Sequence, residues 1–140
     1  MPDAKTIVKQ VLEEPWKGNW NVLDQHIAPE YIGHDAANPQ TISGIDGLKA
    51  NFQTYIDGFG DARITIDQQL AEGDMVASRW TGRGTHTGEI MGIAPTGKEV
   101  TVTGITISKL RDGKIIEDWT NWDALGMLVQ LGAVPTPARA

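Results

Sequence analysis

The sequence contains no cysteine. That absence excludes a disulfide framework, a thiolate nucleophile and any zinc or iron–sulfur site with cysteine ligands. Long apolar runs are also missing: no segment approaches the ~20 apolar residues of a membrane span, and the first fourteen residues lack the uninterrupted apolar stretch of a secretory signal. We therefore expect a cytoplasmic protein that does not enter a membrane.

Positive charge is scarce, because 12 Lys and Arg residues face 18 Asp and Glu residues, for a formal net charge of −6. No basic cluster is present, so the electrostatic footprint of a nucleic-acid-binding protein is missing, and an acidic surface repels anionic lipid. The three histidines, His26, His34 and His86, show no metal-ligand spacing. The sequence predicts no metal site.

The 140 residues, 40% of them hydrophobic, fit one compact domain over 1–134 followed by a frayed tail over 135–140. Helical spacing of apolar residues predicts a first helix that Asp3 caps and Pro15 ends. A second short helix follows Asn19, and residues 31–41, rich in turn formers, predict a loop. A third helix begins after Ser43 and ends near Gly58.

From Ala62 the apolar period changes from helical to two, which predicts strands. Glu72-Gly73-Asp74 and Asp112-Gly113 are hairpin turn signals. The expected strands are 62–70, 75–86, 98–110 and 114–122, and a short closing helix includes Leu125, Leu128 and Val129.

Helices followed by antiparallel strands indicate an α+β domain in which the helices cover one face of a curved sheet. A cavity is expected between the concave face and the helices. The other face is also partly apolar, so we expect a homodimer through it; a thinly covered monomer is the alternative.

Three ordered motifs carry a family resemblance: 70–89 (LAEGDMVASRWTGRGTHTGE), 92–97 (GIAPTG) and 111–126 (RDGKIIEDWTNWDALG). Over residues 4–133 the chain resembles the SnoaL-like polyketide cyclase (ester cyclase) family. The resemblance implies the cone-shaped α+β fold of the nuclear-transport-factor-2-like superfamily. It also implies ring closure by an intramolecular aldol reaction, in which a carboxylate acts as acid and base without metal or cofactor.

The family pattern of Glu-x-Trp followed by an Asp matches Glu117, Trp119 and Asp123, which share one strand face if pairing is regular. Asp123 is the predicted acid/base; the alternative is an N-cap of the closing helix. Asp118 is the rival carboxylate, and a one-residue bulge would bring it to the pocket. The alternative is that Asp118 is a charged residue at the edge of the sheet or at an interface.

His34 stands where the family has a pocket histidine and is the third catalytic candidate, unless it is a loop residue that bonds the backbone. The candidate ligand contacts are six residues: Trp20, Asn51, Tyr55, Trp80, His86 and Trp119. Trp20 is also assigned to the helix layer, and the alternative for His86 is a structural role in a turn. Trp122 is placed on the opposite sheet face.

Together with these residues, the resemblance implies a cofactor-free acid/base enzyme of the cyclase or isomerase kind that acts on a hydrophobic carbonyl compound. The alternative is a binding protein that holds a small hydrophobic ligand without converting it. A buried carboxylate with a raised pKa would favour the enzyme.

Overall fold

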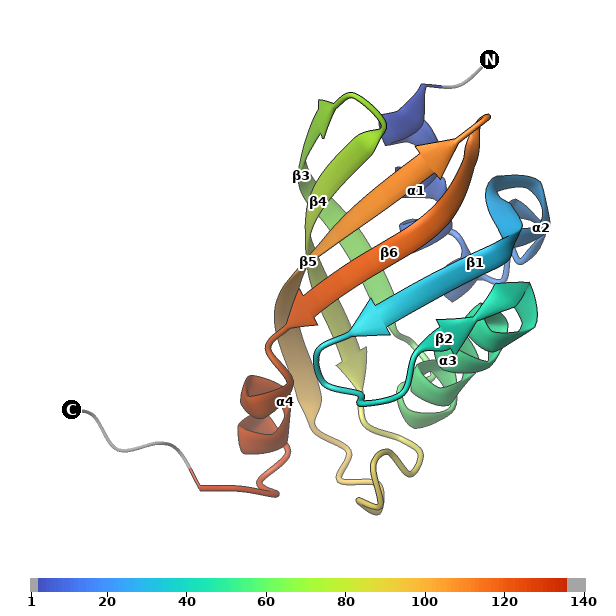
Figure 1. The fold of residues 1–140 in the computed structure, drawn as a ribbon. Coiled ribbons are helices and arrows are strands. Elements are labelled where there is room, and N and C mark those ends of the chain that lie inside the picture. The colour runs from blue at the N-terminus through green and yellow to red at the C-terminus, as the bar shows by residue number, and fades with distance from the viewer. Residues whose placement is uncertain (1–2, 136–140) are drawn as a thin grey trace.

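The computed structural model describes residues 3–135. It consists of one six-stranded sheet with helices packed against one of its faces (Figure 1). The helices are α1 (Ala4–Glu13), a 3-10 turn η1 (Pro15–Lys17), α2 (Asn21–His26), α3 (Gly44–Gly58) and α4 (Ala124–Gln130). The strands are β1 (Ile27–Asp35), β2 (Ile42–Ser43), β3 (Arg63–Glu72), β4 (Met75–Thr85), β5 (Glu99–Arg111) and β6 (Lys114–Trp122). The predicted α+β class is confirmed.

The sheet order is β2-β1-β6-β5-β4-β3. Strands β3 to β6 form a meander of antiparallel neighbours, whereas β1 runs parallel to β6. The last strand therefore lies between the first strand and the meander, and it joins segments from both ends of the chain. Figure 1 shows the sheet curving around α1, α2 and α3, with α4 at the end of the sheet where β5 begins and β6 ends.

The first helix forms as its sequence predicts. The Asp3 side chain caps it by accepting the Thr6 N–H at 2.8 Å, and Ile7, Val8 and Val11 are buried on one face. Pro15 is buried at the start of η1, and Gly18 ends that turn with a left-handed φ of 90°. Because the apolar stripe packs on β3 and β4, α1 closes one side of the concave face.

The expected loop over 31–41 is wrong in its first half, because β1 extends to Asp35. Turn-forming residues in this stretch suggested a loop, yet β1 pairs with β6 from Ile32 to Asp35. Pro29 falls in the irregular stretch between Ile27 and Ile32, where its missing N–H breaks no regular ladder. The second helix also ends earlier than expected, at His26.

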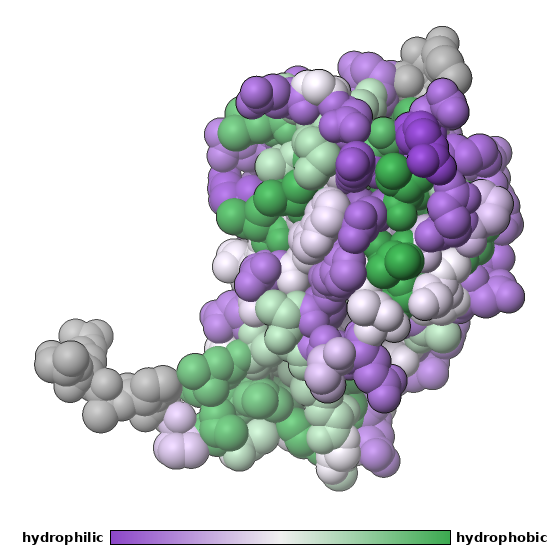
Figure 2. Space-filling view, in the orientation of Figure 1, coloured by the Kyte–Doolittle hydropathy of each residue, from purple (hydrophilic) through white to green (hydrophobic). Residues whose placement is uncertain are grey.

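The outer face of the sheet carries exposed apolar side chains. Ile32, Ile105 and Ile107 are 41%, 48% and 39% exposed. In the β5–β6 register Ile107 lies beside Trp119. Figure 2 shows green apolar surface interrupted by purple polar residues on this side of the molecule, with further green surface toward α4.

Within residues 3–135 no helix has the length and hydropathy needed to cross a membrane. Apart from Pro135, the expected tail over 135–140 lies outside the described residues.

Candidate active site

A cavity of about 180 Å³ lies between the concave face of the sheet and the helices. Its lining is mostly apolar and includes seven Phe, Tyr and Trp residues: Trp16, Tyr31, Phe52, Tyr55, Phe59, Trp80 and Trp122. A few polar groups from β1, β5, β6 and α3 interrupt this lining. Such a pocket, apolar with few convergent polar groups, is the usual form of a small-molecule site.

A bulge in β6 decides which of its residues face the cavity. Ile115 pairs with Leu110 and Glu117 with Lys109, so Ile116 is an extra residue without a partner in β5. Ile115 is buried in the core, and regular alternation would bring Glu117 and Trp119 to the same side. The extra residue reverses the alternation.

Asp118, Thr120 and Trp122 consequently line the cavity. The predicted places of Trp119 and Trp122 are therefore wrong, and the two residues exchange faces. The predicted alternation holds only from Glu117 onward, because the bulge at Ile116 interrupts it, and the predicted choice of the pocket face was wrong.

Asp123 does not line the cavity, so its predicted place at the pocket is wrong. Its carboxylate accepts the Gly126 N–H at 2.9 Å and caps α4. This is the alternative that the sequence left open for Asp123. The rival carboxylate, Asp118, is the one that the fold brings to the cavity wall.

The carboxyl group of Asp118 is buried, with the residue only 6% exposed. Its Oδ2 accepts a hydrogen bond from the Tyr31 hydroxyl at 2.9 Å, whereas Oδ1 has no hydrogen-bond partner among the described residues. Burial raises the pKa of Asp118 to about 6, although the hydroxyls of Ser108 and Tyr31 favour the charged form. A carboxyl group with this pKa exchanges protons near neutral pH.

Ser108 stands directly opposite Asp118 in the β5–β6 register. Its hydroxyl is buried and lies near enough to lower the pKa of Asp118, but neither this hydroxyl nor Asp118 Oδ1 makes a hydrogen bond of normal geometry among residues 3–135. Two polar atoms without a partner on facing residues are unusual, since buried polar groups are ordinarily paired.

A second cluster of polar contacts in the cavity is centred on Asp35, at the end of β1. Asp35 accepts hydrogen bonds from Trp122 Nε1 at 3.1 Å and from the Ala37 N–H at 2.8 Å. Tyr55 packs edge-on against Trp122, with ring centroids 5.9 Å apart. Burial, and then the charge of Asp35, raise the pKa of Tyr55 to about 12, which keeps its hydroxyl protonated.

Asn51 lies one helical turn before Tyr55 on α3, and both line the cavity as the sequence predicts. Neither side chain makes a hydrogen bond to another described residue. They are therefore available to a ligand.

Trp80 is the third predicted contact that lines the cavity. Its ring lies against Gly104 of β5, where a Cβ atom would come within 2.4 Å of the indole. Its Nε1 donates to Thr106 Oγ1 at 3.1 Å, and Thr106 in turn bonds Thr120 across the strands at 2.9 Å. The indole is thus held as a fixed wall.

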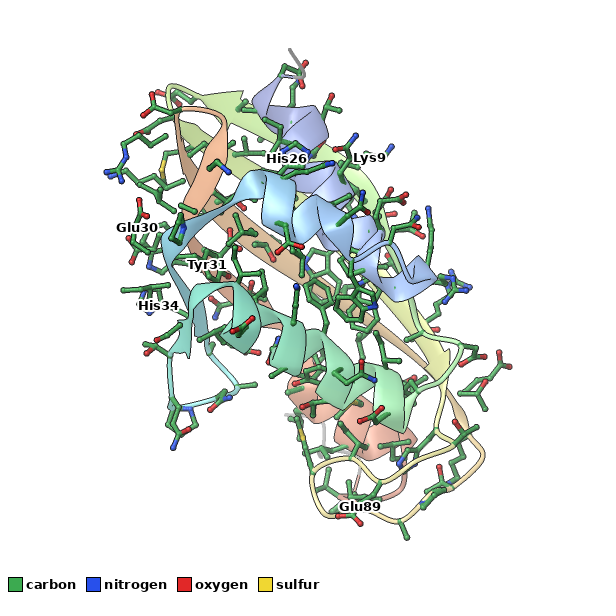
Figure 3. All side chains as sticks on the ribbon, turned by 90° about the vertical axis from the view of Figure 1, so that its right-hand side faces the viewer. Lys9, His26, Glu30, Tyr31, His34 and Glu89 are labelled. Atoms are coloured by element: carbon green, nitrogen blue, oxygen red, sulfur yellow. The ribbon has the colours of Figure 1, made fainter. Side chains whose placement is uncertain are left out.

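The imidazole of His34 lies on the outer face of the sheet, contrary to prediction. It pairs with Glu117 at 2.7 Å and stacks on Trp119, both of which point away from the cavity. In Figure 3 Tyr31 points inward from β1, whereas His34 points outward from the same strand. Neighbouring residues of a strand face opposite sides, which accounts for the difference.

His86 and Trp20 do not line the cavity either. His86 is fully buried beside Phe59, and its Nδ1 accepts the Thr96 N–H at 3.2 Å, so it holds the loop over 87–97 as the structural alternative predicted. Trp20 packs edge-on against Phe52 in the helix layer. Their predicted role as ligand contacts is not supported by these positions.

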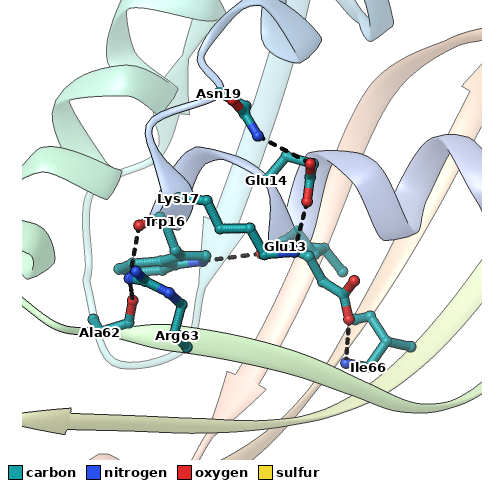
Figure 4. A network of polar contacts seen from close by, with 9 residues as sticks. Glu13, Glu14, Trp16, Lys17, Asn19, Ala62, Arg63 and Ile66 are labelled. Carbon is teal, nitrogen blue, oxygen red and sulfur yellow. Dashed lines mark hydrogen bonds and ion pairs between the residues drawn. The ribbon is translucent and has the colours of Figure 1, made fainter.

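Arg63 fastens one edge of the cavity. Its Nη1 donates to the Trp16 carbonyl at 2.9 Å and thereby ties η1 to the start of β3 (Figure 4). Trp16 is held from the other side too, because its Nε1 donates to the Leu12 carbonyl at 2.9 Å. This edge is therefore braced by hydrogen bonds as well as by packing.

Tyr31 and Asp35 escaped the sequence-based prediction. The signal was present in Tyr31-Ile-Gly-His-Asp35, because alternate residues of a strand share a face and Tyr31, Gly33 and Asp35 are spaced by two. Among residues 3–135 no group of three potential metal ligands occurs.

The profile of a protein family described as SnoaL-like polyketide cyclase matches residues 6–131. The chain belongs to the SnoaL-like polyketide cyclase family. No curated protein matches the sequence. This SnoaL-like chain has the cone-shaped α+β fold expected from the resemblance, and a structural neighbour from Catenulispora acidiphila is described as having a ketosteroid isomerase-like fold.

Solved structures similar to this SnoaL-like chain come from several bacteria. IdmH, a candidate polyketide cyclase from Streptomyces antibioticus, is 33% identical, with a TM-score of 0.78 over 92% of this chain and 97% of its own. A candidate SnoaL-like cyclase from Jannaschia sp. CCS1 is 26% identical, with a TM-score of 0.83 over 93% and 92%. AclR, a candidate hydroxylase from Streptomyces galilaeus, is 27% identical, with a TM-score of 0.82 over 96% and 84%.

Proposed function

We propose that this SnoaL-like protein is a cofactor-free acid/base enzyme of the cyclase or isomerase kind, which acts on a hydrophobic carbonyl compound. The observation that carries the proposal is the buried carboxyl group of Asp118 in the wall of an otherwise apolar cavity, with its pKa raised to about 6. Perturbed carboxyl groups in apolar clefts are typical of catalytic acids and bases.

In the proposed reaction the Asp118 carboxylate takes a proton from the carbon next to a carbonyl group, and an enolate forms. The enolate carbon attacks a second carbonyl carbon of the same molecule, so a carbon–carbon bond forms and that carbonyl becomes an alkoxide. Protonated Asp118 then returns the proton to the alkoxide oxygen. An isomerase would use the first and last transfers alone, with the proton returned to a different carbon.

Asn51 and Tyr55 are the proposed donors for the enolate oxygen. Both line the cavity, and the raised pKa of Tyr55 keeps its hydroxyl neutral and able to donate. Donors in a water-poor pocket stabilise developing negative charge more strongly than donors in water. Asp35 is less suited to act as a base, because Trp122 and Ala37 already donate to its carboxylate.

The volume of the cavity also limits the size of the proposed substrate. Its volume of about 180 Å³ is close to that of an engineered apolar cavity of roughly 150 Å³ that binds benzene. A substrate whose buried part is one ring, or two fused rings, fits this space. Trp80 and Trp122 offer flat apolar walls for such rings.

The test is proton exchange without a known substrate. The protein is incubated in D2O with a panel of aryl ketones and β-keto esters, and deuterium at the carbon next to the carbonyl is followed by NMR. Asp118→Asn is expected to lower the enzyme-dependent rate at least 100-fold, in line with the roughly 10²- to 10⁴-fold worth of a general base. Asp123→Asn is the matched control and should exchange at the rate of the unaltered protein.

Equal rates for Asp118→Asn and the unaltered protein would overturn the assignment. The aromatic lining of the cavity favours one other function, that of a binding protein for a small hydrophobic ligand. Binding without exchange, detected by quenching of tryptophan fluorescence and equal in both proteins, would support that alternative.

We also propose a homodimer through the outer face of the sheet. Ile105 and Ile107 are exposed there, Trp119 lies beside Ile107, and exposed apolar side chains gathered on one face mark interaction sites. Sedimentation should show a dimer that the double substitution Ile105→Lys and Ile107→Lys converts to monomer. Met91→Lys, at the 51%-exposed Met91 in the loop between β4 and β5, is the control that leaves the mass unchanged.

A further inference from the structure

We infer that Tyr31, seated on the bare backbone of Gly33, is the positioning residue for Asp118. The inference rests on the proposed function for its catalytic meaning, although the geometry that carries it is independent of the reaction. Tyr31 does not itself take the substrate proton; it acts through the carboxyl group to which it donates.

The placement of the phenol depends on a glycine. Tyr31 and Gly33 share the inner face of β1, and Gly33 stands opposite Asp118 in the parallel β1–β6 register. A Cβ atom on residue 33 would lie 2.6 Å from the Tyr31 hydroxyl oxygen and 3.2 Å from the ring carbon that bears it. The phenol therefore lies along its own strand across Gly33, and this brings its hydroxyl to the carboxyl group on the next strand.

The hydrogen bond has a defined direction. Burial, together with the neighbouring charge of Asp118, raises the pKa of Tyr31 well above its ordinary value, so the phenol keeps its proton and donates it. The acceptor is Asp118 Oδ2 at 2.9 Å. Because this bond fixes one oxygen, it holds the plane of the carboxyl group relative to the cavity.

The same hydrogen bond opposes the effect of burial on the pKa of Asp118. The Tyr31 and Ser108 hydroxyls both lower the pKa that burial raises, and no nearby charge contributes. Among the described residues that line the cavity, the other ionisable side chains are Asp35, Tyr55, Arg63 and Arg83, together with His34, whose ring lies on the outer face. Without the Tyr31 hydroxyl, Asp118 would bind its proton more tightly and less carboxylate would be present at neutral pH.

The experiment follows the titration of Asp118 directly. Protein labelled with ¹³C at the aspartate carboxyl carbons is titrated by NMR, and the signal of Asp118 is identified by its loss in Asp118→Asn. Tyr31→Phe keeps the ring and removes the hydroxyl, so it should shift the midpoint upward by on the order of one unit, the effect of one lost hydrogen bond to a carboxylate. Tyr55→Phe, which alters another cavity tyrosine, is the matched control and should leave the midpoint unchanged.

Gly33→Ala tests the seat of the phenol. It should shift the midpoint in the same direction as Tyr31→Phe, and the double variant should shift it no further, because both changes remove the same bond. If Gly33→Ala does not fold, Tyr31→Phe alone decides. An unchanged midpoint in Tyr31→Phe overturns the inference.

Proton exchange on the ketone panel separates this inference from the proposed function. In Tyr31→Phe the pH at half-maximal exchange should move by the same amount as the NMR midpoint. If Asp118→Asn exchanges at the full rate while Tyr31→Phe still shifts the titration, the proposed function fails and the positioning role stands. If Asp118→Asn is inactive while the titration of Tyr31→Phe is unchanged, the proposed function stands and the positioning role of Tyr31 fails.

Discussion

Glu13, in the last turn of α1, accepts a hydrogen bond from the main-chain N–H of Ile66 at 2.8 Å (Figure 4). Ile66 lies where β3 leaves regular register with β4: Ile66 pairs with Trp80 and Gln68 with Arg79, so Asp67 is an extra residue. The Glu13 carboxylate thus satisfies a main-chain donor of the edge strand β3, and it anchors α1 to that strand.

Replacement of Glu13 by alanine should lower the free energy of unfolding by about 2 kcal/mol, because a hydrogen bond to a charged group is lost and a partly buried N–H is left without its partner. Urea denaturation measures the change. Glu14→Ala, which removes an exposed ion pair with Lys17 and a hydrogen bond from Asn19, is the control and should cost less than Glu13→Ala. Equal losses in the two variants would contradict the role of Glu13.

Gly104→Ala should destabilise the protein strongly. The added methyl group would lie 2.4 Å from the Trp80 ring and 2.8 Å from Trp122 Cβ, so two walls of the cavity would have to move. We expect a loss of about 1–3 kcal/mol, the usual cost of overpacking, and a changed tryptophan fluorescence spectrum. Gly60→Ala is the matched control: its methyl group meets nothing closer than 3.7 Å. A thermal midpoint equal to that of the control would refute the packing argument.

The charge state of Asp118 should make stability depend on pH. Its pKa in the folded protein is about 6, above the ordinary 3.8, so the folded state holds this proton more tightly than the unfolded chain does. Below the unfolded value both states are protonated and the group has no effect. Between the two values the unfolded chain releases the proton first, so stability falls as pH rises, and above the folded value the full cost of burying the charge remains. At 1.36 kcal/mol per unit the full penalty is roughly 3 kcal/mol.

The comparison is between the unaltered protein and Asp118→Asn, by denaturation from pH 4 to pH 8. The free energy of unfolding of Asp118→Asn should rise relative to that of the unaltered protein across the interval from 3.8 to about 6 and stay constant above it. Asp123→Asn retains Asp118 and should follow the unaltered protein. Parallel curves for Asp118→Asn and the unaltered protein would rule out a raised pKa.

Asp123→Ala should cost about 1 kcal/mol of stability, because the N-cap of α4 loses its acceptor, whereas Asp123→Asn should be nearly neutral. Thermal unfolding compares the two. Proton exchange on the ketone panel should be unchanged in Asp123→Asn. A large loss of exchange in that variant would restore Asp123 as the candidate base.

Local patterns were sufficient for much of the fold. The Asp3 cap and the spacing of Ile7, Val8 and Val11 predicted α1, and alternation with the Asp112-Gly113 turn predicted β5 and β6. The strand β1 was missed because its partner, β6, is remote in sequence, and a strand that contains Pro29 and Gly33 has weak local preference. Pairing across the sheet outweighs that preference.

The candidate site was harder to predict, for a reason that one residue illustrates. Ile116 is an additional residue in β6, and it turns every later side chain of that strand to the opposite face. Sequence alternation identifies Asp118 and Trp122 as one set and Trp119 and Asp123 as another. The bulge that decides between the sets depends on pairing with β5, which alternation along a single strand does not reveal.

The central position of β6 has a consequence for biosynthesis. Tyr31 and Asp118 are 87 positions apart in the chain, and β6 fills the gap between β1 and β5. Until the ribosome has delivered this strand, the two flanking strands present open edges on which other nascent chains can pair. A chaperone that shields unpaired strands should therefore raise the yield most for chains that stop before Lys114.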